Sequence, residues 1–138
     1  MRIRDVMATD LPTVEPEESV RDAACRMTEA GVQALPVCDG ERLTGIITDW
    51  DVTRAMASSE DASSQPLRDY MSTNLVAATP DAQLGEVSEL MANRRIHHVL
   101  VRDGERFAGM VHLDVEWSQM GGMETPTATF SSKIYVSW

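Results

Sequence analysis

The stretch V-C-D-G-E-R-L-T-G-I-I at residues 37–47 returns as V-R-D-G-E-R-F-A-G-M-V at residues 101–111. Each stretch contains an Asp-Gly pair, which favours a tight β-hairpin turn because glycine accepts the positive φ that such turns need. Apolar residues lie on both sides of the pair, so each stretch predicts two antiparallel strands. The chain is therefore expected to use one hairpin unit twice.

The similarity extends outward from the two hairpins without a gap. Residues 3–49 (copy one) align with residues 67–113 (copy two) at a constant shift of 64 positions. The identical pairs are Arg4/Arg68, Asp5/Asp69, Met7/Met71, Thr9/Thr73, Leu11/Leu75, Pro16/Pro80, Met27/Met91, Val37/Val101, Asp39/Asp103, Gly40/Gly104, Glu41/Glu105, Arg42/Arg106 and Gly45/Gly109. A repeat of this length is a supersecondary unit used twice. The copies are expected to pack about a pseudo-two-fold axis and to form related clefts where they meet.

Each copy is predicted to contain a strand, a helix, two strands and a second helix. In copy one the strand covers residues 13–15, and apolar residues then recur at helical spacing over residues 20–27. Ser19 and Gly31 are the expected caps of this helix. The corresponding apolar stripe of copy two covers residues 84–91, and both stripes are expected to be buried.

These elements predict an α/β (α+β) fold of two βαββα repeats. The first repeat is expected to cover residues 1–57 and the second 67–118, with a polar linker at 58–66. The remaining residues, 119–138, are interpreted either as a poorly ordered tail or as an added strand that docks on a partner.

Composition excludes several classes of function. The net charge of −10 argues against a nucleic-acid binder, which needs a basic face. No apolar stretch approaches the roughly 20 residues that span a bilayer. The N-terminus runs directly into the repeat, so a cytoplasmic protein is expected. Cys25 and Cys38 lack metal or redox spacing and are interpreted as buried free thiols.

The sequence G-I-I-T-D-W-D at residues 45–51 could carry binding chemistry, because it predicts a strand that runs directly into a helix. At such a junction Thr48 could donate to a phosphate, and Asp51 could accept the hydroxyl groups of a ribose. In the alternative interpretation, Thr48 and Asp49 only cap the helix and Asp51 only favours its first turn.

The repeat and this motif together resemble a tandem pair of cystathionine-β-synthase (CBS) domains, often called a Bateman module. The resemblance covers about residues 4–118 and rests on D-V-M, T-V-E-P, A-L-P-V, the Asp-Gly turn and the 45–51 motif. It implies two copies packed through their sheets, adenosyl ligands such as AMP, ADP, ATP or S-adenosylmethionine in the clefts, and pairing into a homodimer. It also implies regulation of a separate protein.

The resemblance assigns ligand-binding roles residue by residue. In the first cleft, the residues beside the base are Thr13, Val14 and Pro16. Backbone contacts and an apolar wall come from Ala34, Leu35 and Pro36. Thr48 faces the phosphate and Asp51 the ribose. The corresponding positions of the second cleft are Ala78, Pro80, His97, His98, His112 and Asp114.

The second cleft departs from the family pattern. It reads G-M-V-H-L-D, with His112 in place of the hydroxyl and one residue fewer before Asp114. The two clefts are therefore expected to be unequal. The three histidines all fall in copy two, but adjacent strand residues point to opposite faces, so no metal site is predicted.

Two functions are carried forward. The first is a regulatory module, not an enzyme, that senses an adenine nucleotide or a related adenosyl ligand and signals to a partner protein. The alternative is a dimeric scaffold that works without a ligand. No nucleophile–base pair or phosphate-binding glycine loop indicates catalysis.

Overall fold

The computed structural model describes residues 1–96 and 98–112 of the chain. The longer elements are β1 (Ala34–Asp39), β2 (Arg42–Thr48), β3 (Ala77–Ala78), β4 (His98–Asp103), β5 (Arg106–His112), α1 (Val20–Ala30), α2 (Asp49–Ser58) and α3 (Leu84–Arg94). Three single turns of 3-10 helix are Ile3–Asp5 (η1), Ala62–Ser64 (η2) and Leu67–Asp69 (η3). The second helix expected in copy two and the segment 119–138 lie outside the described residues.

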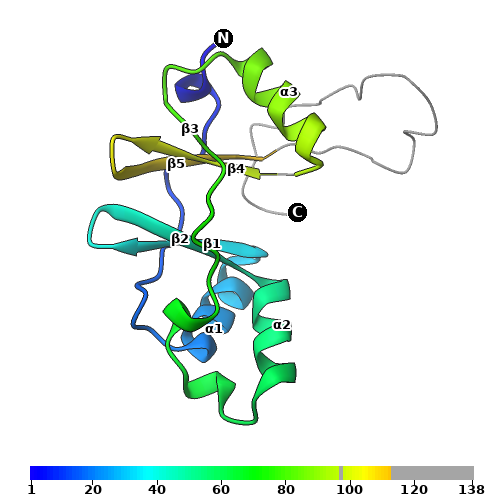
Figure 1. The fold of residues 1–138 in the computed structure, drawn as a ribbon. Helices are drawn as coiled ribbons and strands as arrows, with labels where there is room; N and C mark the ends of the chain where they lie inside the picture. The colour runs from blue at the N-terminus through cyan, green and yellow to red at the C-terminus, as the bar shows by residue number, and fades with distance from the viewer. Residues whose placement is uncertain (97, 113–138) are drawn as a thin grey trace, which may run out of the picture.

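The two predicted hairpins form the centre of the molecule. β1 pairs with β2 and β4 with β5, both antiparallel, and the strand order is β1-β2-β5-β4-β3. The hairpins meet where Arg42 of β2 is paired with Arg106 of β5. Figure 1 shows the hairpins one above the other, with α1 and α2 on one outer side and α3 on the other. The mixed α/β fold with two packed repeats is thus confirmed.

The repeat holds down to irregular details of the backbone. Both hairpins contain a register shift at corresponding places, after Val37 in copy one and after Val101 in copy two. Gly40 and Gly104 in the turns have φ of 63° and 62°. A positive φ suits glycine because it has no Cβ to clash with the backbone. The sequence repeat therefore reports a real structural repeat.

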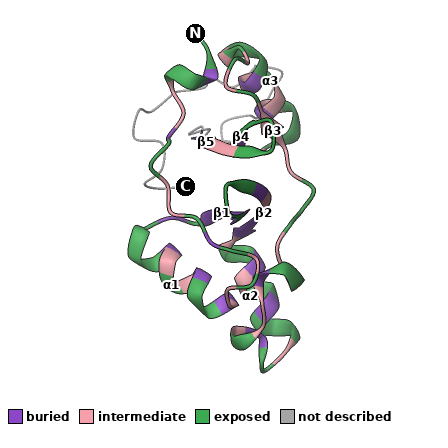
Figure 2. Cartoon of the chain, turned by 90° about the vertical axis from the view of Figure 1, so that its left-hand side faces the viewer, coloured by how far each residue is buried: buried purple, intermediate pink, exposed green. Residues whose placement is uncertain are grey.

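Buried apolar side chains form three clusters, one within each copy and one between them. In copy one, α1 packs on β1 and β2, and in copy two, α3 packs on β4 and β5. The cluster between the copies comprises Ala34, Cys38, Leu43, Ile46, Leu100 and Met110. Figure 2 shows the buried residues on the strands and on the inner faces of the helices.

The copies also exchange their opening segments. The Ile3 N–H donates to the Ala82 carbonyl at 2.9 Å, and the Leu67 N–H donates to the Glu18 carbonyl at 2.8 Å. Ile3 therefore lies in the core of copy two and Leu67 in the core of copy one, each with 0% exposure. Figure 1 shows the N-terminus beside α3 and far from α1.

Reciprocal ion pairs accompany this exchange. Arg4 of copy one pairs with Asp81 of copy two, and Arg68 of copy two pairs with Glu17 of copy one. Each pair joins positions that correspond at the 64-residue shift, as expected for a pseudo-two-fold arrangement. Neither copy is therefore complete without the first residues of the other.

Two glycines allow the exchanged segments to approach the sheets. A Cβ on Gly45 would lie 2.8 Å from the Ser72 carbonyl oxygen, and one on Gly109 would lie 2.6 Å from that of Ala8. At these contacts Ile46 bridges to Ser72 and Met110 bridges to Ala8. The conserved spacing of the two glycines within the repeat thus has a steric reason.

Several local predictions are confirmed and others need correction. α1 begins at the Ser19 cap, ends at Gly31, and buries Val20 and Met27. In α3, Val87 and Met91 are buried, but Leu84 is only half-buried. Of the strand expected at residues 13–15, only Val14 is paired, in a parallel bridge to Val37.

The prediction for the cysteines is wrong for one of them. Cys38 is buried, and Cys25 is exposed on α1. Position 25 belongs to the solvent-facing side of the amphipathic helix, so burial of the thiol is not compatible with the stripe that faces the core. Within the described residues, no helix is long and apolar enough to cross a membrane.

Candidate functional site

Thr48 and Asp51 meet at the junction between β2 and α2. The Thr48 hydroxyl accepts a hydrogen bond from the Asp51 N–H at 3.1 Å, and the Asp51 carboxylate accepts one from the Thr48 N–H at 2.9 Å. This reciprocal arrangement is a capping box, which satisfies two N–H groups that the helix leaves without partners. The capping role expected of Thr48 is confirmed, whereas Asp49 is the first residue of α2 and not its cap. Asp51 itself is buried, with 6% exposure, and is not a freely exposed first-turn carboxylate.

The same carboxylate is also held by Arg54 one turn further along α2. The Arg54 Nη2 atom lies 2.5 Å from Asp51 Oδ1, while the Arg54 side chain remains 62% exposed. A carboxylate has about four lone-pair positions, so the cap leaves acceptor capacity on Asp51. A ribose approaching this oxygen would compete with the exposed guanidinium and not with the cap.

The hairpin register places the remaining residues of the first cleft around this junction. Ala34 is paired with Thr48, and Leu35 with Ile47. The Val14 N–H donates to the Pro36 carbonyl at 3.1 Å, which attaches residues 13–16 to the outer edge of β1. Leu35 is fully buried in the core of copy one, so its side chain packs among apolar residues of the protein.

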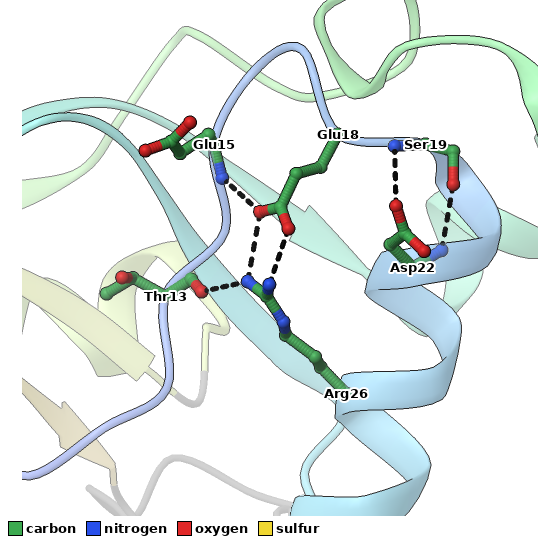
Figure 3. A network of polar contacts seen from close by, with 6 residues as sticks. All are labelled: Thr13, Glu15, Glu18, Ser19, Asp22 and Arg26. Carbon is green, nitrogen blue, oxygen red and sulfur yellow. Dashed lines mark hydrogen bonds and ion pairs between the residues drawn. The ribbon is translucent and has the colours of Figure 1, made fainter.

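An arginine on α1 holds the segment that is predicted to lie beside the base. Figure 3 shows that Arg26 donates to the Thr13 carbonyl at 2.7 Å and forms an ion pair with Glu18 at 2.5 Å. Glu18 in turn accepts from the Glu15 N–H at 2.7 Å. Thr13, Glu15 and Glu18 are thereby fixed to one helix. Sequence analysis missed Arg26 and Glu18, because no motif marks two residues that act through a loop.

The second cleft is built on the same register with different side chains. His98 is paired with His112, as Ala34 is with Thr48 in copy one. His112 is buried and His98 is half-buried. Ala78 is paired with Val101 in β3, and the Pro80 carbonyl accepts from the Arg4 N–H at 3.0 Å.

Two residues assigned to the second cleft, His97 and Asp114, lie outside the described residues. The effect of the shortened turn on Asp114 stays a prediction. Within residues 1–96 and 98–112, no group of three histidine, cysteine or acidic side chains could hold a metal ion. Burial raises the pKa of the Cys38 thiol to about 11, which keeps it protonated and a poor metal ligand near neutral pH.

Comparison with known proteins gives consistent matches. The family described as CBS domain matches residues 3–58 and 67–114. The CBS domain-containing protein YhcV of Bacillus subtilis is 33% identical over 128 residues, which are 91% of this chain and 91% of that protein.

Solved structures show the same fold. An acetoin utilization protein (AcuB) from Vibrio cholerae superposes with a TM-score of 0.78 at 25% identity, covering 81% of this chain and 84% of that one. The CBS domain pair of protein MJ0100, solved with 5′-methylthioadenosine and S-adenosyl-L-methionine, has a TM-score of 0.68 at 26% identity. That match covers 81% of this chain and 89% of the MJ0100 chain.

Proposed function

The chain belongs to the CBS domain family, and we propose that it is a regulatory module that binds an adenosine-bearing ligand in the cleft of copy one. The observation that carries the proposal is the buried Asp51 carboxylate beside Thr48, at the start of α2 and at the edge of β1. This carboxylate would accept the hydroxyl groups of a ribose. The first N–H groups of α2 already have partners within the protein, so a nearby phosphate would be favoured by the positive end of the helix dipole. The complex of MJ0100 with two adenosyl compounds supports this class of ligand.

The surrounding residues divide the cleft into a polar and an apolar part. Thr48 and Asp51 would take the phosphate and the ribose. Val14 and Pro16 would lie beside the base, with Ala34 to Pro36 as the opposite wall. A flat apolar slot next to a few polar groups is the usual form of a nucleotide site.

The proposal extends to assembly and partner. Trp50 and Met56 of α2 are exposed at 64% and 51%, and with Met1 they are the large apolar side chains that are exposed in the described residues. Such surface supports a homodimer that forms through this helix. The module would then signal to a separate regulated protein, and no residue is assigned a catalytic role.

The test is titration calorimetry of AMP, ADP, ATP and S-adenosylmethionine into the wild type and the Asp51→Ala variant. Loss of a hydrogen bond to a charged group costs about 1.5–3 kcal/mol, so the affinity for the ligand that binds should fall about 10- to 150-fold. Asp49→Ala is the matched control, because Asp49 lies in the same helical turn but is exposed.

The cap and the ligand site can be separated in the same variants. Loss of the cap should lower the free energy of unfolding of Asp51→Ala by about 1 kcal/mol, measured in denaturant without ligand. If Asp51→Ala and the wild type had equal affinities, the ligand would bind elsewhere than in this cleft. A lack of binding by every compound would leave the second candidate, the scaffold that works without a ligand, which the exposed face of α2 favours.

A further inference from the structure

A polar cavity lies near the turn end of the hairpins, whereas Thr48 and Asp51 lie at the end where β2 runs into α2. Its volume is about 360 Å³, and we call it the arginine cavity. It is lined by Arg42, Leu43, Thr44, Thr73, Asn74, Leu75 and Arg102. Along β2, Arg42 is about 20 Å from Thr48, and Thr44, the lining residue nearest to Thr48 in the strand, is about 13 Å from it.

The lining is positively charged although the chain is strongly acidic. It contains two arginines and no carboxylate, in a protein with a net charge of −10. Arg42 has one ionic partner, Glu105, at 3.8 Å, and both side chains are largely exposed at 65% and 77%. Such a long, exposed pair is weak. Arg102 has no ion pair or side-chain hydrogen bond within the described residues.

The repeat supplies an internal comparison for this charge. At the shift of 64 positions, Arg42 corresponds to Arg106, but Arg102 corresponds to Cys38 and Asn74 to Asp10. The equivalent place in the other half therefore has one arginine and one carboxylate. The Arg106–Glu41 pair at 3.7 Å is the equivalent of the Arg42–Glu105 pair, so the difference between the halves lies in Arg102 and Asn74. Two arginines without a lining carboxylate are thus specific to one side of the pseudo-two-fold.

We propose that the arginine cavity binds a small phosphate-bearing anion. Guanidinium groups present forked N–H donors that match phosphate oxygens, and Arg42 and Arg102 would supply them. The hydroxyls of Thr44 and Thr73 add neutral donors, as does the Asn74 amide. The volume is at the low end of ligand sites, which suits a small molecule.

Such a ligand would join the two copies. Arg42 and Thr44 belong to β2 of copy one, whereas Thr73, Asn74 and Arg102 belong to copy two. A ligand that binds only the folded arrangement stabilises it by mass action. The anion would therefore raise the melting temperature of the full chain, in addition to any effect of an adenosyl ligand in the first cleft.

The experiment is titration calorimetry of inorganic pyrophosphate into the full chain at low ionic strength, with citrate at equal concentration as the carboxylate control. Saturable binding of one pyrophosphate is expected. Arg102→Gln should lower its affinity about tenfold or more, since a charged donor is lost. Asn74→Asp introduces the residue that Asp10 supplies in the other half, and it should also lower the affinity because its carboxylate repels pyrophosphate.

Two matched variants make the result decisive. Asp10→Asn changes the corresponding position of the other half and should leave pyrophosphate affinity within about twofold of the wild type. Arg106→Gln should lower the affinity less than Arg102→Gln does, because Arg106 is paired with Arg42 across the hairpins but does not line the cavity. All four altered residues are exposed, and denaturant unfolding would check that each variant is folded. An equal loss in Arg106→Gln and Arg102→Gln would overturn the proposal, as would citrate binding as tightly as pyrophosphate.

The outcome is also separable from the proposed nucleotide site. Asp51→Ala should retain full pyrophosphate binding, because Asp51 is at the other end of β2. Loss of pyrophosphate binding in Asp51→Ala would place the anion in the nucleotide cleft and refute the second site. Pyrophosphate binding with no adenosyl binding would support this site and refute only the nucleotide proposal.

Discussion

The first helix of copy one, α1, and the first helix of copy two, α3, differ in the residues that cap their ends. α1 begins with a capping box at Ser19 and ends with Gly31 at a φ of 68°. α3 begins at Gln83, whose side chain makes no capping bond, and ends with Arg95 at a φ of 52°. Arg95 is the one residue other than glycine with a positive φ in the described chain. Copy two therefore keeps a helix whose ends are locally unfavourable.

The segment before the first helix is also held by more polar contacts in copy one than in copy two. Arg26 and Glu18 hold the Thr13 segment in copy one, whereas the corresponding residues of copy two are Leu90 and Ala82. Side-chain bonds therefore hold the Thr13 segment to α1 in copy one, whereas leucine and alanine cannot form such bonds in copy two. This supports placing the adenosyl ligand in copy one.

The largest expected loss of stability comes from the two side chains that the copies exchange. Ile3→Ala and Leu67→Ala each remove a fully buried side chain from the core of the opposite copy, so each should cost about 2–5 kcal/mol of unfolding free energy. Denaturant unfolding would measure both. Met1→Ala is the control, because Met1 is 74% exposed. A negligible cost at Ile3 would contradict the exchange of opening segments.

The next effect tests the close approach of those segments to the sheets. Gly109→Ala and Gly45→Ala should each destabilise by about 1–3 kcal/mol, because the added methyl group meets a backbone carbonyl that cannot move alone. Gly109→Ala should cost more, since its contact is closer. Gly85→Ala in α3 meets nothing within 4 Å and should instead stabilise by about 0.5–1 kcal/mol. Thermal and denaturant unfolding would rank the three.

A smaller effect separates the helix ends of the two copies. Arg95→Gly should stabilise the protein by about 0.5–1 kcal/mol, because glycine has no Cβ to strain at a positive φ. Gly31→Arg makes the reverse change in copy one and should destabilise by about 1 kcal/mol. If Arg95→Gly destabilised, Arg95 would be held by interactions that repay its strain.

The smallest effect is chemical. Cys38 holds in copy one the position that Arg102 holds in copy two, but it is buried and its pKa is raised to about 11. Mass spectrometry after alkylation at pH 8 should show a label on the exposed Cys25 and none on Cys38. An Arg102→Cys variant should gain a second label.

The raised pKa of Cys38 also makes the free energy of unfolding depend on pH. The folded state binds the Cys38 proton more tightly than the unfolded state, so its contribution is complete below pH 9.0 and is lost as pH rises towards about 11. The free energy of unfolding should therefore fall over that interval, and Cys38 should become reactive as the protein opens. Labelling of Cys38 at pH 8 in the folded protein would contradict its burial.

Local sequence patterns predicted the repeat, the two hairpins, the caps of α1 and the junction of Thr48 and Asp51. Each of these rests on residues close in the chain, where spacing and turn chemistry act directly. The same information could not distinguish a helix cap from a ligand group at Asp51, because both require a carboxylate at that place.

Other features became visible only in the folded protein. They are the exchange of Ile3 and Leu67, the burial of Asp51, the hydrogen bond from Arg26 to the Thr13 carbonyl, and the cavity lined by Arg42 and Arg102. These contacts join residues distant in the chain or reached through a loop. They depend on how the two copies pack and not on any local pattern, so they leave no periodic signal in the sequence. The repeat predicted two similar halves, and the packing of distant residues gave each half contacts that the other lacks.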